Sequence, residues 1–352
     1  MSKLIRTKKI RIEASTICQL RCPSCPTSSN ANQPFLGRGF LKPNDFRKIL
    51  DDNPWISEVE LSNYGEIFLN PALLDIIKMA YQRDVALHAD NGVNLNTAGQ
   101  EVLEGLVKYK FRSMSCSLDG ACNEAYRKYR VQGNFDAVIE NIKYINLCKQ
   151  KYQSPYPYLS WQFVVFGHNE QEIQTARRMA NDLNMGFHVK LSWDSSFSPV
   201  KDLEAIRKEA GAASRDEFKR KTGRNYQCGI CHQLWDSPQI NWDGKLLGCC
   251  RNFWGDFGGN VFADGLSESL NNEKISYAKK MLLGKDEARP DIPCASCNIF
   301  LEMTADKMWL NRGFSYRIGQ AGKGIPVFLR QYPFIYNALR TLFKSFRHRL
   351  YQ

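Results

Sequence analysis

Short apolar runs alternate with segments of helical periodicity over the first 194 residues of the chain. The expected strands are Lys9–Ala14, Glu58–Ser62, Ala86–Asp90, Ser113–Leu118, Leu159–Phe166 and Phe187–Trp193. Between them, apolar residues recur at spacings of three and four in Asn44–Asp52, Ala72–Gln82, Thr97–Val107, Asn134–Cys148 and Glu170–Leu183, as in amphipathic helices. Six strand–helix units predict an α/β fold with a parallel sheet, open or curled into a partial TIM-like (β/α)6 barrel.

The pattern changes after this repeat, which we assign to residues 1–195. Residues 196–226 are polar and predict a helical connector. Residues 227–300 contain short strands and turns, with Asp243-Gly244 as the expected hairpin turn between Gln239–Asn241 and Leu246–Gly248. Residues 301–352 form a basic extension. The sequence therefore predicts a barrel followed by a smaller second domain and a tail.

The tail carries much of the positive charge of the chain. The formal net charge is +12, and from Leu301 to Gln352 nine Lys and Arg face two Asp and Glu, a net charge of +7. Residues Pro333–Leu350 predict a basic amphipathic helix, which either docks on the body or lies on the inner surface of a membrane as a peripheral contact. No apolar run is long enough to span a bilayer or to form a signal peptide, so we expect a cytoplasmic protein.

Twelve cysteines in a cytoplasmic chain favour metal binding over disulfides, because that compartment keeps thiols reduced. Cys116, Cys122 and Cys148 stand apart and are expected to pack as small apolar residues. The other nine form two groups.

The first cysteine group follows directly on the first expected strand. Cys18, Cys22 and Cys25 lie within eight residues, at the end of the strand where α/β folds place their chemistry. Three thiolates can each bind one iron of a cubane and leave the fourth iron open. A zinc knot is the alternative, although structural zinc takes four ligands and this loop offers three.

This loop resembles the hallmark Cys-x3-Cys-x2-Cys motif of the radical S-adenosylmethionine (SAM) superfamily, and the resemblance covers about Lys8 to Trp193. It implies a four-iron four-sulfur (4Fe-4S) cluster whose open iron binds SAM and whose electron cleaves it to a 5′-deoxyadenosyl radical. It also implies an enzyme that takes hydrogen from a substrate, with an external electron donor such as flavodoxin or ferredoxin.

Other positions resemble the SAM contacts of this family. Gly65 and Glu66, after the second strand, correspond to part of its Gly-Gly-Glu-Pro motif, in which Tyr64 here replaces a glycine and Ile67 the proline. Asn91 after the third strand and Ser117 at the end of the fourth are further candidates. Arg130, in a Tyr-x3-Arg segment, could pair with the SAM carboxylate.

Two further lumen candidates come from the last two strands. Gln162 lies between Trp161 and Phe163 on the fifth strand, and Asp194 follows the sixth. Either could contact SAM or substrate. Because successive strand residues face opposite sides, Cys116 should pack outward if Ser117 faces SAM.

The second cysteine group resembles the SPASM or twitch domain that follows many radical SAM barrels. The resemblance implies a second, auxiliary 4Fe-4S cluster, for which we favour Cys231, Cys249, Cys294 and Cys297. Cys228 and Cys250 remain as alternate ligands, packed thiols or hydrogen-atom donors. By spacing alone, a four-cysteine zinc ribbon also fits.

These features leave three hypotheses. The first is an oxidoreductase that removes hydrogen from a small polar molecule, such as a sugar, cyclitol or envelope-glycan precursor, with the auxiliary cluster taking the second electron. The second is modification of a peptide or protein side chain, or epimerisation; the short sequence before Lys8 leaves no room for a leader-binding domain ahead of the barrel. The third is a non-catalytic iron-sulfur or zinc protein that binds nucleic acid. It leaves the SAM-type loop unexplained, so we expect no nucleic-acid partner.

The two cysteine groups predict the iron content. Anaerobically reconstituted protein should hold about eight irons as two cubanes, because each group supplies enough thiolates for one. Replacing Cys18, Cys22 and Cys25 by Ala together should remove half of this iron and abolish formation of 5′-deoxyadenosine. Full SAM cleavage by this triple variant would contradict the assignment.

Overall fold

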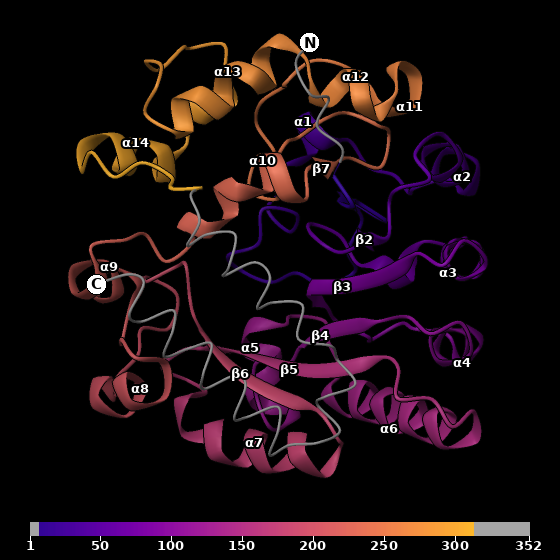
Figure 1. Ribbon diagram of the computed structural model, residues 1–352. Helices are drawn as coiled ribbons and strands as arrows, with labels where there is room; N and C mark the ends of the chain where they lie inside the picture. The colour runs from indigo at the N-terminus through magenta and orange to yellow at the C-terminus, as the bar shows by residue number, and fades with distance from the viewer. Residues whose placement is uncertain (1–6, 313–352) are drawn as a thin grey trace.

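The computed structural model describes residues 7–312, and its centre is a seven-stranded parallel sheet (Figure 1). The strand order is β6-β5-β4-β3-β2-β1-β7. The strands are β1 (Lys9–Ile12), β2 (Glu58–Glu60), β3 (Ala86–Val93), β4 (Ser113–Ser117), β5 (Tyr158–Val165), β6 (Gly186–Leu191) and β7 (Gln239–Ile240). The predicted six strands and their parallel arrangement are therefore confirmed. In the described part of the chain, β6 and β7 are the two edges of the sheet and do not pair with each other.

Helices α2, α3, α4 and α6 stand side by side along one face of the sheet (Figure 1). The barrel helices are α1 (Gln33–Leu36), α2 (Pro43–Asp52), α3 (Leu73–Gln82), α4 (Gln100–Lys108), α5 (Asn123–Tyr129), α6 (Phe135–Lys151) and α7 (Ile173–Asp182). Two short 3-10 turns accompany them, η1 (Ile67–Leu69) and η2 (Glu170–Glu172). The expected helices are present, with ends that coincide or differ by up to three residues.

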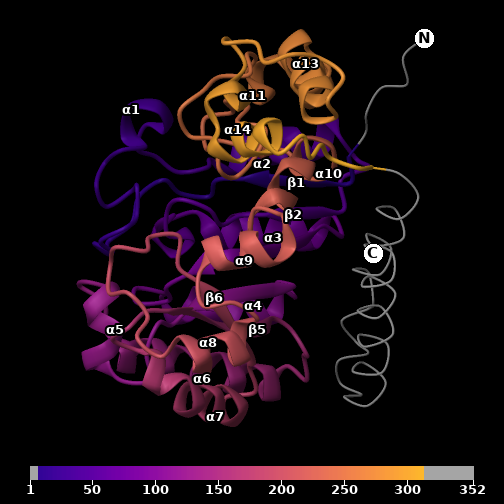
Figure 2. The same cartoon turned by 90° about the vertical axis from the view of Figure 1, so that its left-hand side faces the viewer.

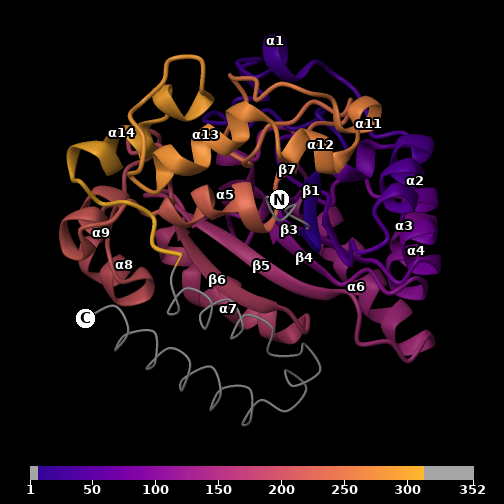
Figure 3. The ribbon, with the colours of Figure 1, turned by 45° about the horizontal axis from the view of Figure 1, so that its top comes forward.

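The helices of the cysteine-rich region gather beside β1 and β7, at the opposite end of the sheet from α7, whereas α8 (Leu203–Ala210) packs against β6 (Figures 2 and 3). The connector forms α8 and α9 (Arg215–Thr222). The cysteine-rich region forms η3 (Cys228–His232), α10 (Gln233–Asp236), α11 (Val261–Asp264), α12 (Leu266–Leu270), α13 (Glu273–Leu282), η4 (Pro293–Ser296) and α14 (Asn298–Ala305). The predicted tail helix Pro333–Leu350 lies outside the described residues.

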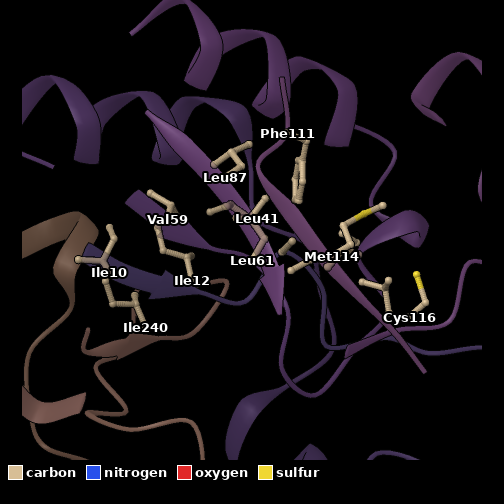
Figure 4. Packing of buried hydrophobic residues seen from close by; sticks show 14 of the residues in the cluster. Ile10, Ile12, Leu41, Val59, Leu61, Leu87, Phe111, Met114, Cys116 and Ile240 are labelled. Atoms are coloured by element: carbon tan, nitrogen blue, oxygen red, sulfur yellow. The ribbon is translucent and has the colours of Figure 1, made fainter. Parts of the chain in front are cut away.

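Alternate strand residues build the core between the sheet and its helices. Ile10, Ile12, Val59, Leu87 and Met114 are at most 2% exposed and point to the same side of the sheet (Figure 4). Burying apolar side chains of this size contributes about 1.5–3 kcal/mol each. Because the strand period is two, the residues between them face the other side.

The short strand β7 joins the second cysteine region to the main sheet. The expected hairpin is present, since Ile240 pairs antiparallel with Leu246 and Gly244 adopts a positive φ of 91° at the turn. The two residues of β7, Gln239 and Ile240, also pair in parallel with Arg11 and Ile12 of β1. A strand has two hydrogen-bonding edges, and the sequence predicted a partner for only one of them.

The hairpin also docks against the loop before α2. The indole Nε1 of Trp242 and the side-chain amide of Asn241 both donate to the carbonyl oxygen of Leu36, at 2.9 Å. A Cβ atom built on Gly39 would lie 2.6 Å from the Trp242 ring. Glycine at position 39 therefore allows the ring to lie directly on the backbone.

This close approach predicts a stability difference between two glycines. Gly39→Ala should lower the free energy of unfolding by about 1–3 kcal/mol, because the methyl group must displace the packed Trp242 ring. Gly99→Ala serves as the control, since a Cβ atom built on Gly99 would have no atom within 4 Å. Urea unfolding of the two variants measures the difference. Equal stabilities would contradict the packing described.

Candidate functional site

The face of the sheet away from the core is polar, and we call it the lumen face. Its side chains include buried charges on the first two strands and polar groups on the others. They are Arg11, Glu13, Glu60, Ser62, His88, Asp90, Ser113, Ser115, Ser117, Ser160, Gln162, His188 and Lys190. Hydrogen bonds join neighbouring strands, such as His88 Nδ1 to Ser113 Oγ at 2.8 Å and Ser160 Oγ to His188 Nδ1 at 3.1 Å. The Ser115 hydroxyl is buried without a hydrogen-bond partner among the described residues. This face is therefore suited to a polar molecule.

The first cysteine loop lies where β1 ends. Cys22 is buried, Cys18 and Cys25 are half-buried, and all three pack against an apolar cluster that contains Leu20 and Tyr129. Burial raises the pKa of the Cys18 thiol to about 12, and the neighbouring Glu66 carboxylate and the other two thiolates contribute to the increase. As ligands these groups would be thiolates, and the positive charge of an iron-sulfur core would stabilise them in that form.

The end of β6 holds this loop in place. The Ser24 hydroxyl, between the second and third cysteines, donates to Asp194 Oδ2 at 2.6 Å, and the Trp193 indole donates to the Ser24 carbonyl oxygen at 3.3 Å. Hydrogen bonds from Ser196 and Ser24 lower the pKa of Asp194 to about 2. Asp194, predicted as a lumen residue, thus contacts the cluster loop.

Arg130 connects the loop to the end of β4. Its Nε donates to Asp119 Oδ2 at 2.7 Å, and its Nη1 lies 3.6 Å from Cys22 Sγ. Asp119 is fully buried and also accepts from the backbone N–H of Val164 at 2.7 Å. The predicted contact of Arg130 with the SAM carboxylate stays a prediction. The structure shows instead that the Arg130 cation lies beside the Cys22 thiol.

Gly65 and Glu66 pack against the segment between β1 and Cys18, where the backbone N–H of Glu66 donates to the Ile17 carbonyl oxygen at 2.8 Å. A Cβ on Gly65 would fall 2.1 Å from the Ser15 carbonyl oxygen, so close backbone packing alone already requires glycine there. Glu66 is buried, accepts from the backbone N–H of Asn94 at 2.6 Å, and caps η1. Burial raises the pKa of its carboxyl to about 7.

Asn94 is a site residue that the sequence analysis missed. Its side-chain Nδ2 lies 3.8 Å from Cys18 Sγ, and its Oδ1 accepts from the Gln19 amide at 2.9 Å. Asn91, which was predicted, is exposed and donates to the Asn63 side chain at 2.7 Å. The predicted strand ends at Asp90, whereas β3 continues irregularly to Val93. The signal in the sequence that could have identified Asn94 is the polar Asn-Leu-Asn run directly after this strand.

Ser117 and Gln162 face the lumen from adjacent paired positions of β4 and β5. The Ser117 hydroxyl lies close to the backbone of Gly92, where an added Cβ would be 2.8 Å from Ser117 Oγ. Gln162 accepts a hydrogen bond from Lys190 Nζ. Cys116 is fully buried in the core on the opposite face (Figure 4). The expected alternation of Cys116 and Ser117 is therefore present.

The second cysteine group brings several thiols near one another, and Cys228 is also among the neighbours of Cys231. Burial raises the pKa of the Cys231 thiol, and the neighbouring thiolates of Cys249, Cys294 and Cys297 raise it further. Burial likewise raises the pKa of the Cys294 thiol, and the neighbouring thiolates of Cys249 and Cys297 raise it further. These are the four predicted ligands. They come from η3, from the end of the hairpin and from either end of η4.

Cys228 and Cys250 are the other two cysteines of this region, and each also neighbours one of the four thiols. The Cys250 thiol is buried within electrostatic reach of Arg11 and Glu13 on the lumen face, and its backbone N–H donates to Gln233 Oε1 at 2.7 Å. Cys228 is half-buried near Arg224 and Cys231. Of the two, Cys250 is the thiol nearer the lumen.

Within residues 7–312, no three Cys, His, Asp or Glu side chains converge closely enough to hold a single metal ion. A cubane takes one thiolate per iron, so its ligands need not meet at one point. None of the helices described in this part of the chain is long and apolar enough to cross a membrane.

Three thiols lie on the loop after the first strand of a parallel α/β sheet, which is the arrangement that resembles the radical SAM superfamily. The family model described as the radical SAM superfamily matches residues 12–180. Residues 12–180 therefore form a radical SAM domain, and the chain is an enzyme, so the non-catalytic hypothesis is set aside. A search of curated protein sequences found no significant match.

Solved structures share the fold. The chain resembles Streptococcus suis SuiB bound to S-adenosylmethionine with a TM-score of 0.59 and 15% identity, over 84% of this chain and 71% of that one. It resembles anSMEcpe with bound AdoMet with a TM-score of 0.54 and 14% identity, over 83% and 86% of the two chains. The family implies a 4Fe-4S cluster and SAM, and the three-thiol donor set of Cys18, Cys22 and Cys25 fits the cluster.

The buried carboxyl of Glu13 on the lumen face predicts a pH dependence. It accepts hydrogen bonds from the Asn63 amide at 2.8 Å and from the Tyr64 backbone N–H at 3.2 Å, yet burial raises its pKa from 4.5 to about 7. Since the folded pKa is raised, the contribution to stability is present below about pH 4.5 and is lost as the pH rises towards 7.

Between pH 5 and 7 this carboxyl should lower the free energy of unfolding by roughly 1 kcal/mol per pH unit. Glu13→Gln should flatten the wild-type slope by that amount in anaerobic urea unfolding. Glu140→Gln, at an exposed carboxylate on α6 that pairs with Lys143, is the control and should not change the slope. Parallel curves for wild type and Glu13→Gln would show that Glu13 is charged throughout this range.

Proposed function

We propose that this enzyme removes hydrogen from a small polar molecule in the lumen and carries out a net two-electron oxidation. The observation that supports this most is the polar lumen face, which the Cys250 thiol of the second cysteine group approaches within electrostatic reach of Arg11, Glu13 and Lys190. A sugar, cyclitol or envelope-glycan precursor has the hydroxyl groups that such a lining would bind.

The lumen favours a hydroxylated substrate because many of its polar groups come from side chains with both donors and acceptors. Ser115 and Gln162 are buried, and the Ser115 hydroxyl has no protein partner among the described residues. Leaving such a group unsatisfied costs about 1–3 kcal/mol, and a substrate hydroxyl would remove this cost. An apolar substrate would increase it.

The reaction needs an acceptor for one electron. When bound, the first cluster supplies the electron that cleaves SAM to the radical that takes a hydrogen atom from a carbinol carbon. The substrate radical then loses one electron and its hydroxyl proton and becomes a ketone. Cys231, Cys249, Cys294 and Cys297 would hold an auxiliary cluster of the SPASM or twitch type as the electron acceptor, and the proton would pass to water. A flavodoxin or ferredoxin would supply the electron for SAM cleavage.

Epimerisation is the second candidate, and the position of Cys250 favours it. Its thiol is within electrostatic reach of lumen residues, so it could return a hydrogen atom to a substrate radical. Modification of a peptide or protein side chain is the other alternative within the same chemistry. Oxidation, epimerisation and side-chain modification give different products, so analysis of the products distinguishes the three reactions.

The auxiliary cluster is tested by removing two of its proposed ligands. Cys294→Ala with Cys297→Ala should halve the iron, retain 5′-deoxyadenosine formation and lose the carbonyl product from pools of sugars and cyclitols. Cys122→Ser, at an exposed cysteine on the barrel, is the matched control. Retention of carbonyl product in the double variant, or zinc in place of iron, would contradict the proposed electron acceptor.

Incubation in deuterated water distinguishes oxidation from epimerisation. Oxidation should give a product that is lighter by two hydrogens, with one 5′-deoxyadenosine per turnover. A product of unchanged formula that gains one solvent deuterium, and loses this label in Cys250→Ala, would replace oxidation by epimerisation.

A further inference from the structure

Three cations without carboxylate partners lie between the β6 edge of the sheet and the second cysteine region. They are Lys190 on β6, Arg215 at the start of α9 and Arg251 directly after Cys250. No ion pair joins any of them to a carboxylate among residues 7–312. By contrast, Arg83, Arg177 and Arg289 on the surface each pair with an acid.

Lys190 projects from the lumen face towards this group. Its ammonium donates to Gln162 Oε1, a neutral acceptor. Burial lowers the pKa of Lys190, and the neighbouring Arg215 guanidinium lowers it further. The Cys250 thiol is also within electrostatic reach of Lys190, which places the ammonium between β6 and the cysteine-rich region.

Arg215 is held at the carboxyl end of β6. Its Nε donates to the Leu191 carbonyl oxygen at 3.0 Å, and its guanidinium carbon lies 4.8 Å from the centre of the Tyr226 ring. Burial lowers its pKa, and the charge of Arg251 lowers it as well. Repulsion between the two arginines is therefore not compensated by a carboxylate of the described chain.

Arg251 completes the group from the other side. Its Nη1 donates to Gln227 Oε1 at 3.1 Å and its Nη2 to Asn298 Oδ1 at 2.8 Å, both neutral side chains. Its Nε is buried and has no hydrogen-bond partner within residues 7–312. The Tyr64 hydroxyl donates to its carbonyl oxygen at 2.8 Å, which fixes the backbone beside the end of β2. The Arg251 guanidinium therefore keeps a hydrogen-bond donor without a protein partner among the described residues.

We infer that Lys190, Arg215 and Arg251 bind a phosphoryl group of the substrate. This inference rests on the proposed function and narrows its substrate class to a phosphorylated polar molecule. A phosphate monoester carries about −1.5 to −2 charges at neutral pH and matches three cations better than a carboxylate with one charge. Guanidinium groups also present paired donors to phosphate oxygens.

The group differs from the predicted SAM carboxylate contact. Arg130, the candidate for that contact, already pairs with the buried Asp119. Lys190, Arg215 and Arg251 come from β6, the connector and the cysteine-rich region, beyond the part of the sheet that carries the SAM candidates Gly65, Glu66, Asn91 and Ser117. They would therefore hold a group of the substrate other than the carboxylate of SAM.

Isothermal titration calorimetry of the reconstituted holoenzyme with SAM tests this site, with inorganic phosphate as the probe and acetate as the monoanion control. Phosphate should bind and acetate should bind at least tenfold more weakly. Lys190→Gln and Arg215→Gln should each weaken phosphate binding by about tenfold or more, the loss of one charge-assisted interaction. Lys190→Arg and Arg215→Lys keep the charge and should retain most of the affinity. Arg289→Gln, which removes one positive charge elsewhere, is the matched control.

Phosphate binding that is absent in the wild type, or unchanged in Lys190→Gln and Arg215→Gln, would overturn the inference. Equal losses of SAM affinity in these variants would also overturn it, because the cations would then serve the cofactor. The measurement involves no turnover, so a failure of the oxidation proposed above would appear in the product assays and leave this result unaffected.

Discussion

Alternation along the strands determines both the stability of this enzyme and where its chemistry is placed. On β1, Ile10 and Ile12 are completely buried against the helices, while Arg11 and Glu13 face the lumen. The same division holds for Val59 and Glu60 on β2, and for Cys116 and Ser117 on β4. A shift of one residue in any of these strands would bury a charged or polar side chain in the core and expose an apolar side chain to the lumen. The apolar face therefore fixes the register that presents the polar face.

The cluster loop depends on this register through the ends of distant strands. Asp119 follows β4 and orients Arg130 towards Cys22, whereas Asp194 follows β6 and holds Ser24. Asn94 follows β3 and approaches Cys18. Because all strands are parallel, their carboxyl ends meet at one edge, and side chains far apart in sequence surround the same three thiols.

The sequence predicted what depends on local periodicity and on cysteine spacing. Strand alternation predicted the opposite faces of Cys116 and Ser117. The choice of four ligands in the second cysteine group rests on its resemblance to SPASM and twitch domains and stays a prediction. The pairing of β7 with β1 was not predicted, because two residues such as Gln239 and Ile240 carry no periodic signal. Asn94 was missed because its role depends on the irregular end of β3, and the contact of Asp194 was missed because its partner Ser24 lies 170 residues away.

The pairing of β7 with β1 makes the two cysteine regions one folding unit. The Cys-x3-Cys-x2-Cys loop leaves the carboxyl end of β1, and the hairpin that ends in Cys249 begins with β7, so adjacent hydrogen-bonded strands lead to both groups. Arg11 strengthens this junction, since its Nε donates to the Gln239 side chain at 3.0 Å. A chain cut between the connector and the second group would leave β1 as an open edge, where strands of other molecules can add. The cysteine-rich region therefore also protects the β1 edge of the sheet.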